Sequence, residues 1–210
     1  MLLCSATLVL LTARSEAAQA PLTWKAGAAA ADITPDGPVW MSGYGSRKKP
    51  SESVAQRISA KALAIEDSLN SRVVIVTLDL STVPRWLRDA VERQVGERYG
   101  LAPGSILLNA SHTHSGPSLS GAAVTFMGGP QVDPEYVKRA DAYGKMVEER
   151  IVRIVGEALS RCGPATLLYT HARAGFAMNR RLLNGYVYQN SPNPEGPVDH
   201  DVPVLRVTAS

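Results

Sequence analysis

The segment 111–117 contains two histidines separated by a single residue, in the sequence Ser-His-Thr-His-Ser-Gly-Pro. It follows the apolar run 106–110, which predicts a short buried strand. Side chains at positions i and i+2 of an extended segment point the same way, so His112 and His114 are expected to converge beyond that strand. Neutral imidazole is the commonest metal ligand in proteins, and a histidine pair is a common start to a zinc site. The alternative is that one or both rings only form hydrogen bonds within a turn rich in Ser and Thr.

An aspartate at position 79 ends the continuous apolar run 73–78. Such a run is typical of a central strand that is covered on both faces. The Asp79 carboxylate could therefore lie at the same sheet edge as His112, where it would support a ligating imidazole or bind the metal itself. Alternatively, Asp79 complements the positive N-terminus of the helix that follows it.

Two loop residues are further candidates for a site. Arg180 stands in a predicted long loop, 179–197, where its guanidinium could hold a carbonyl oxygen or an oxyanion, or could be a plain surface charge. Gly43 lies in a loop punctuated by glycines, where it could let a ligand approach the backbone closely, or could simply form a tight turn. The remaining histidines, His171 and His200, are expected to be structural or exposed rather than ligands.

The elements that must position these residues alternate between strands and helices. One helix is predicted up to residue 99, and a longer one opens with Asp133 and Pro134 as its N-cap and first residue. The apolar stripes of the two helices are Leu87, Val91 and Val95, and then Val137, Ala140, Gly144, Val147, Ile151, Ile154, Val155 and Ala158. Strands are predicted at 28–33, 57–66, 73–78, 106–110, 165–176 and 202–207. This order predicts an α/β fold with a largely parallel central sheet and flanking helices. The domain is expected to be incomplete, because an apolar strand stands last without a closing helix.

Length and composition narrow the class of protein. The chain has 210 residues, of which 45% are hydrophobic and 20% charged, as in an ordinary globular domain. A net charge of +3 with scattered basic residues gives no reason to expect a nucleic-acid partner. Residues 1–20 are predicted to be a signal peptide, because a short apolar run precedes an Ala-x-Ala cleavage pattern, so the protein is expected to be secreted or periplasmic. That run is too short to span a bilayer, and no transmembrane segment is expected.

Several of these segments together resemble the amino-terminal catalytic domain of the neutral/alkaline, non-lysosomal ceramidases. The resemblance covers roughly residues 24–207, and its most specific piece is the His-Thr-His-Ser-Gly-Pro hexapeptide at 112–117. The other pieces occur in the same order and are Ala-Ala-Asp-Ile-Thr-Pro at 30–35, Met-Ser-Gly-Tyr-Gly at 41–45, the run 72–79 and Asn-Arg at 179–180. Residues 21–210 are therefore expected to be the amino-terminal part of such a catalytic domain.

The resemblance implies a chemistry and a role for each matching residue. The family cleaves the amide bond of N-acyl-sphingosines with a zinc ion that activates water. His112 would be a zinc ligand, and His114 would be a catalytic residue that contacts the substrate or the attacking water. Gly43 would contact the substrate, and Arg180 would be a catalytic residue that orients it. The partner would be a lipid-like N-acyl substrate, which could be met at a membrane surface.

The sequence departs from the family pattern in two ways. Asn-Arg at 179–180 is followed by Arg181 and Leu182 instead of Ser-Pro, which favours a different substrate. The family's further zinc ligands, a second His, a Glu and a Tyr, have no counterpart in these residues, and a catalytic zinc normally needs three protein ligands. The chain by itself is therefore expected to be inactive. Two other functions stay open: a ceramidase-like hydrolase of another N-acyl amide or ester, and a non-catalytic extracellular binding module.

Overall fold

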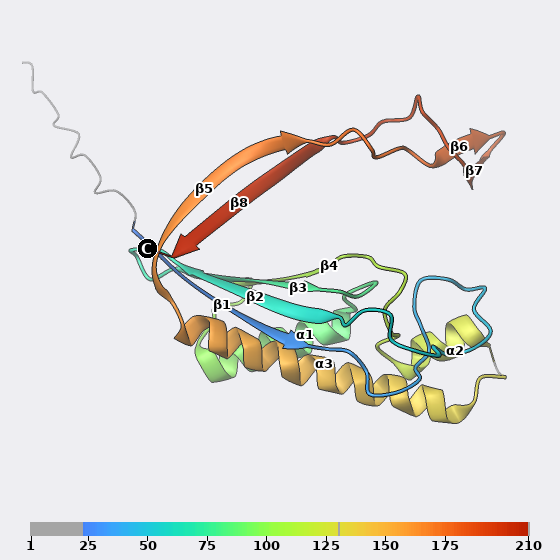
Figure 1. Ribbon diagram of the computed structural model, residues 1–210, viewed down its shortest axis with the longest axis horizontal. Coiled ribbons are helices and arrows are strands. Elements are labelled where there is room, and N and C mark those ends of the chain that lie inside the picture. Colours follow the sequence, from blue (N-terminus) through green and yellow to red (C-terminus); the bar gives the residue numbers. More distant parts are fainter. Residues whose placement is uncertain (1–22, 130, 210) are drawn as a thin grey trace, which may run out of the picture.

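The computed structural model describes residues 23–129 and 131–209, so the predicted signal peptide at 1–20 lies outside the described residues. Strands and helices follow one another in a mixed order, with β5 and β8 forming a long ribbon that rises away from the other strands (Figure 1). The elements are β1 (Trp24–Asp32), β2 (Ser59–Glu66), β3 (Arg72–Leu78), α1 (Arg85–Tyr99), β4 (Ile106–Ala110), α2 (Gly121–Gly128), α3 (Pro134–Ser160), β5 (Gly163–Arg173), β6 (Arg181–Asn184), β7 (Val187–Asn190) and β8 (Asp201–Ala209).

The main sheet is mostly antiparallel, and the prediction of a largely parallel sheet was wrong. Its six strands are ordered β4-β3-β2-β1-β5-β8, and only the β3–β4 pair is parallel. The physical reason is that, among strands that are neighbours in this sheet, only β3 and β4 are joined by a helical crossover, α1. A tight turn at 67–71 instead makes β2 and β3 a hairpin: the Asp67 carboxylate accepts bonds from the backbone of Leu69 and Ser71, and Asn70 takes a left-handed φ of 63°.

Helices α1 and α3 cover one face of the four strands β1 to β4 (Figure 1). The predicted stripe of α1 is buried in full, and α3 buries the whole predicted stripe except Val137, which is half-buried. The N-cap of α3 is also confirmed, because the Asp133 side chain accepts a bond from the Glu135 amide at 2.9 Å and Pro134 opens the helix. Helix α1 ends at Gly100, which adopts the left-handed conformation.

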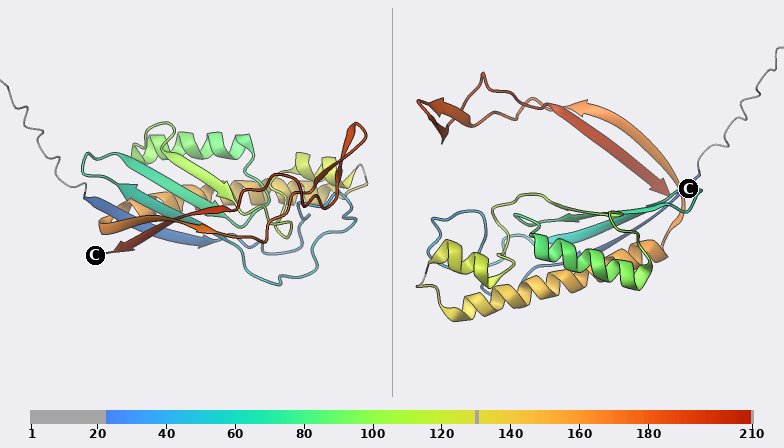
Figure 2. Two further views of the ribbon diagram at one scale, coloured as in Figure 1. Left: turned by 90° about the horizontal axis from the view of Figure 1, so that it is seen from above. Right: turned by 180° about the vertical axis from the view of Figure 1, so that it is seen from behind.

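Among the residues that the structure describes, no helix covers the opposite face of these strands. In β3 the side chains of Val74, Val76 and Leu78 are fully buried under the helices, whereas Val73 is 45% exposed, and Leu107 on the neighbouring β4 is 58% exposed. The prediction that the 73–78 strand is covered on both faces was therefore wrong for the described residues. The β5–β8 ribbon rises on this uncovered side (Figure 2).

One helix and one β-hairpin were not predicted from the sequence. Helix α2 begins after Ser120, whose side chain accepts a bond from the Ala123 amide. The predicted loop 179–197 contains the hairpin of β6 and β7, whose two-residue turn begins with Gly185 at a φ of 62°. Within residues 23–129 and 131–209, no helix combines the length and the apolar character that a bilayer crossing requires.

Candidate active site

Two loops that are far apart in the sequence are joined by backbone hydrogen bonds at one end of the sheet. The Ser42 amide donates to the Gly116 carbonyl at 2.9 Å, and the Ser118 amide donates to the Trp40 carbonyl at 2.8 Å. An isolated antiparallel bridge between Met41 and Pro117 lies between these two bonds. The glycine-punctuated loop and the histidine loop therefore form one unit, which holds both predicted histidines and Gly43.

His112 adopts a left-handed backbone conformation with a φ of 57°. Its Nδ1 lies 2.8 Å from the Ser81 carbonyl oxygen, which can only accept, so Nδ1 carries the proton of the neutral ring. The Nε2 of neutral His112 is thereby left with its lone pair available. A non-glycine residue with positive φ costs about 1–3 kcal/mol, and such residues are concentrated at functional sites. The available Nε2 makes His112 a candidate metal ligand.

The two imidazoles converge, as expected, with their Nε2 atoms 3.4 Å apart and their ring centroids 5.0 Å apart. The expected reason was wrong, because β4 ends at Ala110 and His112 is not extended. The left-handed turn at His112, rather than the alternation of a strand, directs both rings to one point. The Ser81 carbonyl that orients the first ring could not be predicted, since a backbone carbonyl has no signature in the sequence.

Gly43 packs directly against the His114 side chain. Its φ is +101°, and a β-carbon added to Gly43 would stand 2.5 Å from Cγ of His114. The close approach that the sequence suggested at this glycine is therefore made by a side chain of the same protein. Any larger residue at position 43 would have to displace His114.

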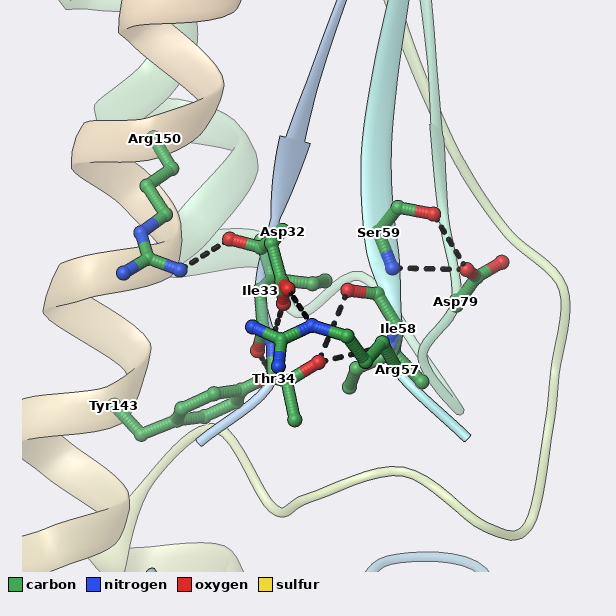
Figure 3. A network of polar contacts seen from close by, with 9 residues as sticks. All are labelled: Asp32, Ile33, Thr34, Arg57, Ile58, Ser59, Asp79, Tyr143 and Arg150. Atoms are coloured by element: carbon green, nitrogen blue, oxygen red, sulfur yellow. Dashed lines mark hydrogen bonds and ion pairs between the residues drawn. The ribbon is translucent and has the colours of Figure 1, made fainter. Parts of the chain in front are cut away.

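Asp79 does not contact either histidine in the described structure. Its Oδ2 accepts hydrogen bonds from the backbone amide of Ser59 at 2.9 Å and from the Ser59 hydroxyl at 3.0 Å (Figure 3). The expected support of the His112 imidazole by this carboxylate was wrong, because the Ser81 carbonyl holds that ring instead. The expected helix role was also wrong, since Asp79 lies outside the first turn of α1. Asp79 ties the end of β3 to the start of β2, and it thereby fixes the backbone that leads to Ser81.

A second polar network anchors the end of β1 next to the site. The Asp32 carboxylate accepts a bond from the Thr34 amide at 2.7 Å and forms an ion pair with Arg57 (Figure 3). Hydrogen bonds from Thr34, helped by the Arg57 charge, lower the pKa of Asp32 to about 2. From α3, Arg150 donates to the Asp32 carbonyl, and the Tyr143 hydroxyl donates to the Ile33 carbonyl at 2.8 Å. Arg150 and Tyr143 therefore hold the end of β1, where the chain continues towards the glycine-punctuated loop.

Arg180 is not brought to the histidines. Its Nε donates to the Asn190 side chain at 3.0 Å, within the β6–β7 region that lies beyond the far end of the β5–β8 ribbon (Figures 1 and 2). The other two histidines are engaged within the ribbon: His171 pairs with Asp201 at 2.8 Å, and the Nδ1 of His200 lies 2.9 Å from the Ala174 carbonyl. Both contacts agree with the expected structural or exposed roles of these residues.

The described residues fit a metal site only in part. His112 offers an available ring nitrogen with its tautomer set by Ser81, which is how proteins commonly orient a ligating imidazole. In the part of the chain that the structure describes, however, no group of three or more His, Cys, Asp or Glu side chains lies close enough together to hold a metal ion. A catalytic zinc normally needs three protein ligands, so the described residues do not by themselves make up a complete zinc site.

Comparisons with a family profile, with curated sequences and with solved structures all point to the same protein family. The sequence profile described as neutral/alkaline non-lysosomal ceramidase, N-terminal, matches residues 24–202. Two curated relatives called neutral ceramidase come from Drosophila pseudoobscura pseudoobscura and Drosophila melanogaster, and each is 30% identical over 101 and 98 residues respectively. These alignments cover 47% and 45% of this chain, but only 14% of each relative.

Two solved structures resemble the fold. They are a neutral ceramidase from Pseudomonas aeruginosa and a ceramidase complexed with C2, with 24% and 25% sequence identity and a TM-score of 0.66 for both. The similarity covers 90% of this chain, whereas the chain spans only 30% and 29% of those proteins. Since the profile match extends over most of the 210 residues, the chain belongs to the neutral/alkaline non-lysosomal ceramidase family.

Proposed function

We propose that this chain is the amino-terminal part, residues 21–210, of the catalytic domain of a zinc-dependent amide hydrolase that cleaves N-acyl-sphingosine into sphingosine and a fatty acid. The observation that supports this most directly is the orientation of His112. Its Nδ1 is held by the Ser81 carbonyl, and its Nε2 points to a second imidazole 3.4 Å away. Family membership supplies the reaction class, because both curated relatives are called neutral ceramidase.

His112 would hold the zinc ion through Nε2, and the remaining protein ligands would come from polypeptide outside these 210 residues. When bound, zinc lowers the pKa of water to about 7 and polarises a substrate carbonyl. Ser81 keeps the His112 ring in the tautomer that binds metal. Because two imidazoles make an incomplete catalytic site, the chain alone is expected to bind zinc weakly and to show no amidase turnover.

His114 would be the catalytic residue beside the metal ligand, where its Nε2 can exchange a proton or a hydrogen bond with the substrate or the attacking water. Gly43 would contribute by leaving room for that imidazole, and its backbone lies within reach of a substrate that approaches His114. Arg180 is proposed as the residue that orients the substrate, on the resemblance alone. Its guanidinium is bonded to Asn190 in the described structure.

A second candidate function is the hydrolysis of a different N-acyl substrate, and one departure from the family sequence favours it. Arg181 and Leu182 follow Arg180 where the family has Ser-Pro, and they begin strand β6. A charged and an aliphatic side chain beside the proposed substrate-orienting arginine favour an N-acyl amide or ester other than ceramide. In either case we propose that the substrate is lipid-like and is met at a membrane surface. We also propose that the protein is secreted or periplasmic.

Zinc titration of the chain tests the metal assignment. Isothermal titration calorimetry should show a site that is lost in His112→Ala and kept in His171→Ala, a matched control that removes a different exposed imidazole. Equal zinc binding by the wild type and His112→Ala would contradict the assignment. Absence of zinc both from this chain and from the product of the complete gene would favour the non-catalytic binding module. The product of the complete gene, tested on N-acyl-sphingosine and on short N-acyl amines, would separate the two hydrolase functions.

A further inference from the structure

We propose that Arg47 and Tyr44 are positioning residues that together hold the His114 imidazole facing His112. The importance of these contacts for activity rests on the proposed catalytic role of His114. The contacts themselves can be tested without a catalytic assay. Neither residue stood among the predicted site residues. Both lie in the loop that is joined by backbone bonds to the histidine loop.

Tyr44 packs its ring against the ring of His114. The two ring centroids are 4.7 Å apart with an interplanar angle of 79°, which is the favoured edge-to-face arrangement of aromatic rings. Tyr44 itself is 55% exposed, so burial of its own surface does not explain where it lies. Its clearest structural consequence is that one side of the His114 ring is closed.

Arg47 makes contact with both partners at once. Its Nη2 donates to the His114 carbonyl oxygen at 2.5 Å, and its Cζ lies 5.3 Å from the centre of the Tyr44 ring. That distance is within the range of a cation–π interaction. The Arg47 amide also donates to the Tyr44 carbonyl at 3.3 Å, which closes the turn that carries both side chains. A single guanidinium therefore fixes the backbone of His114 and the ring that packs on its side chain.

Hydrogen bonding by Nε does not explain the position of Arg47. Its Nε is buried and has no hydrogen-bond partner among the described residues, and a buried donor without a partner is unfavourable. The contacts with Tyr44 and His114 are what hold the guanidinium in this place.

His114 is consequently restricted on three sides. Gly43 lies beneath it, Tyr44 lies against one side, and the Nε2 of His112 lies 3.4 Å from its own Nε2. A histidine on a free loop would sample several rotamers and would have to be ordered whenever a substrate arrived. A histidine that is already held in place avoids that ordering cost, which is the physical advantage of a preorganised site.

The test is the ¹H–¹³C NMR spectrum of the imidazole groups in the 210-residue chain. The Tyr44 ring displaces the His114 signals through its ring current. We expect Tyr44→Leu to remove most of this displacement and Tyr44→Phe to keep it, because Phe retains the aromatic ring. Arg47→Met should also move the His114 signals towards those of a free histidine. Arg47→Lys should restore them, since an ammonium can donate to the same carbonyl and lie over the same ring.

The same spectrum contains a matched control. His171 packs edge-to-face on Tyr169 with ring centroids 4.9 Å apart, so Tyr169→Leu should move the His171 signals and leave His114 unchanged. Unchanged His114 signals in both Tyr44→Leu and Arg47→Met would overturn the proposal. Zinc titration of the product of the complete gene separates this outcome from a failure of the proposed function. If that protein binds no zinc but the His114 signals respond to these variants, the positioning contacts stand and the metal assignment fails.

Discussion

The His114 side chain occupies the space where any residue other than glycine at position 43 would carry its β-carbon. The contact is too close for a methyl group, because that carbon would stand only 2.5 Å from Cγ of His114, and the φ of Gly43 is +101°. Two segments separated by about a third of the chain thus depend on each other sterically. The glycine is required by a neighbouring side chain, and its backbone conformation is one that other residues adopt only under strain.

Replacing Gly43 with alanine should displace His114 and destabilise the fold by about 1–3 kcal/mol, the usual cost of a strained backbone position. Urea unfolding and the His114 NMR signals measure the two effects separately. Gly45→Ala is the matched control, because nothing lies within 4 Å of a β-carbon at that position and its φ is not positive. Equal unfolding midpoints and equal His114 signals in the two variants would contradict the steric argument.

Asp32 should make the stability of the protein depend on pH in strongly acidic solution. Hydrogen bonds from Thr34, with Arg57 beside them, lower the pKa of its carboxyl to about 2, against about 3.9 in an unfolded chain. The folded state thus favours the ionised form, so the stabilisation is fully present above about pH 4 and is lost as the pH falls towards 2.

Urea midpoints measured from pH 5 to pH 2 for the wild type and for Asp32→Asn provide the comparison. The gap between the two proteins should shrink as the pH falls, because the wild-type carboxylate becomes protonated. Parallel curves over this range would show that Asp32 does not carry the effect.

Removing the Asp79 carboxylate should loosen the end of β3. In Asp79→Ala the Ser59 amide and hydroxyl lose their acceptor, at a cost of about 1–3 kcal/mol in the free energy of unfolding. Because the Asp79 backbone leads to the Ser81 carbonyl that orients His112, zinc affinity should fall as well. Asp79→Asn keeps an acceptor oxygen and should lie between the wild type and the alanine variant in both measurements. A stable Asp79→Ala protein with wild-type zinc affinity would refute this connection.

The buried hydroxyl of Tyr143 should contribute measurably to stability. It donates to the Ile33 carbonyl from helix α3, and burial raises the pKa of Tyr143, so the phenol stays protonated as the donor. Tyr143→Phe keeps the packing and removes only this bond, which predicts a loss of about 1 kcal/mol. Thermal or urea unfolding measures it, with Tyr136→Phe, at a half-buried position of the same helix, as the control. A loss of similar size in the control would mean that the Ile33 bond is not the cause.

Elements that are encoded by local patterns were predicted well. Leu87, Val91 and Val95 are all buried in α1, and Asp133 caps α3 as expected, because helical periodicity and capping depend on residues only a few positions apart. The strands at 73–78 and 106–110 were also predicted nearly to the residue. Helix α2 was missed because a short glycine-flanked segment has little periodicity to detect.

The direction of the strands and the contacts between loops depended on tertiary structure. The residues of a strand do not fix the direction of the strand that pairs with it, so the hairpin turn after Glu66 and the pairing of β5 with β1 decided the sheet. The sequence by itself determined which residues could do chemistry, chiefly His112 and His114, because residue type and spacing are local. Only the folded chain decided what orients them. The Ser81 carbonyl, the Gly43 backbone and the Tyr44 ring reach the histidines through space, and such contacts leave no local pattern in the sequence.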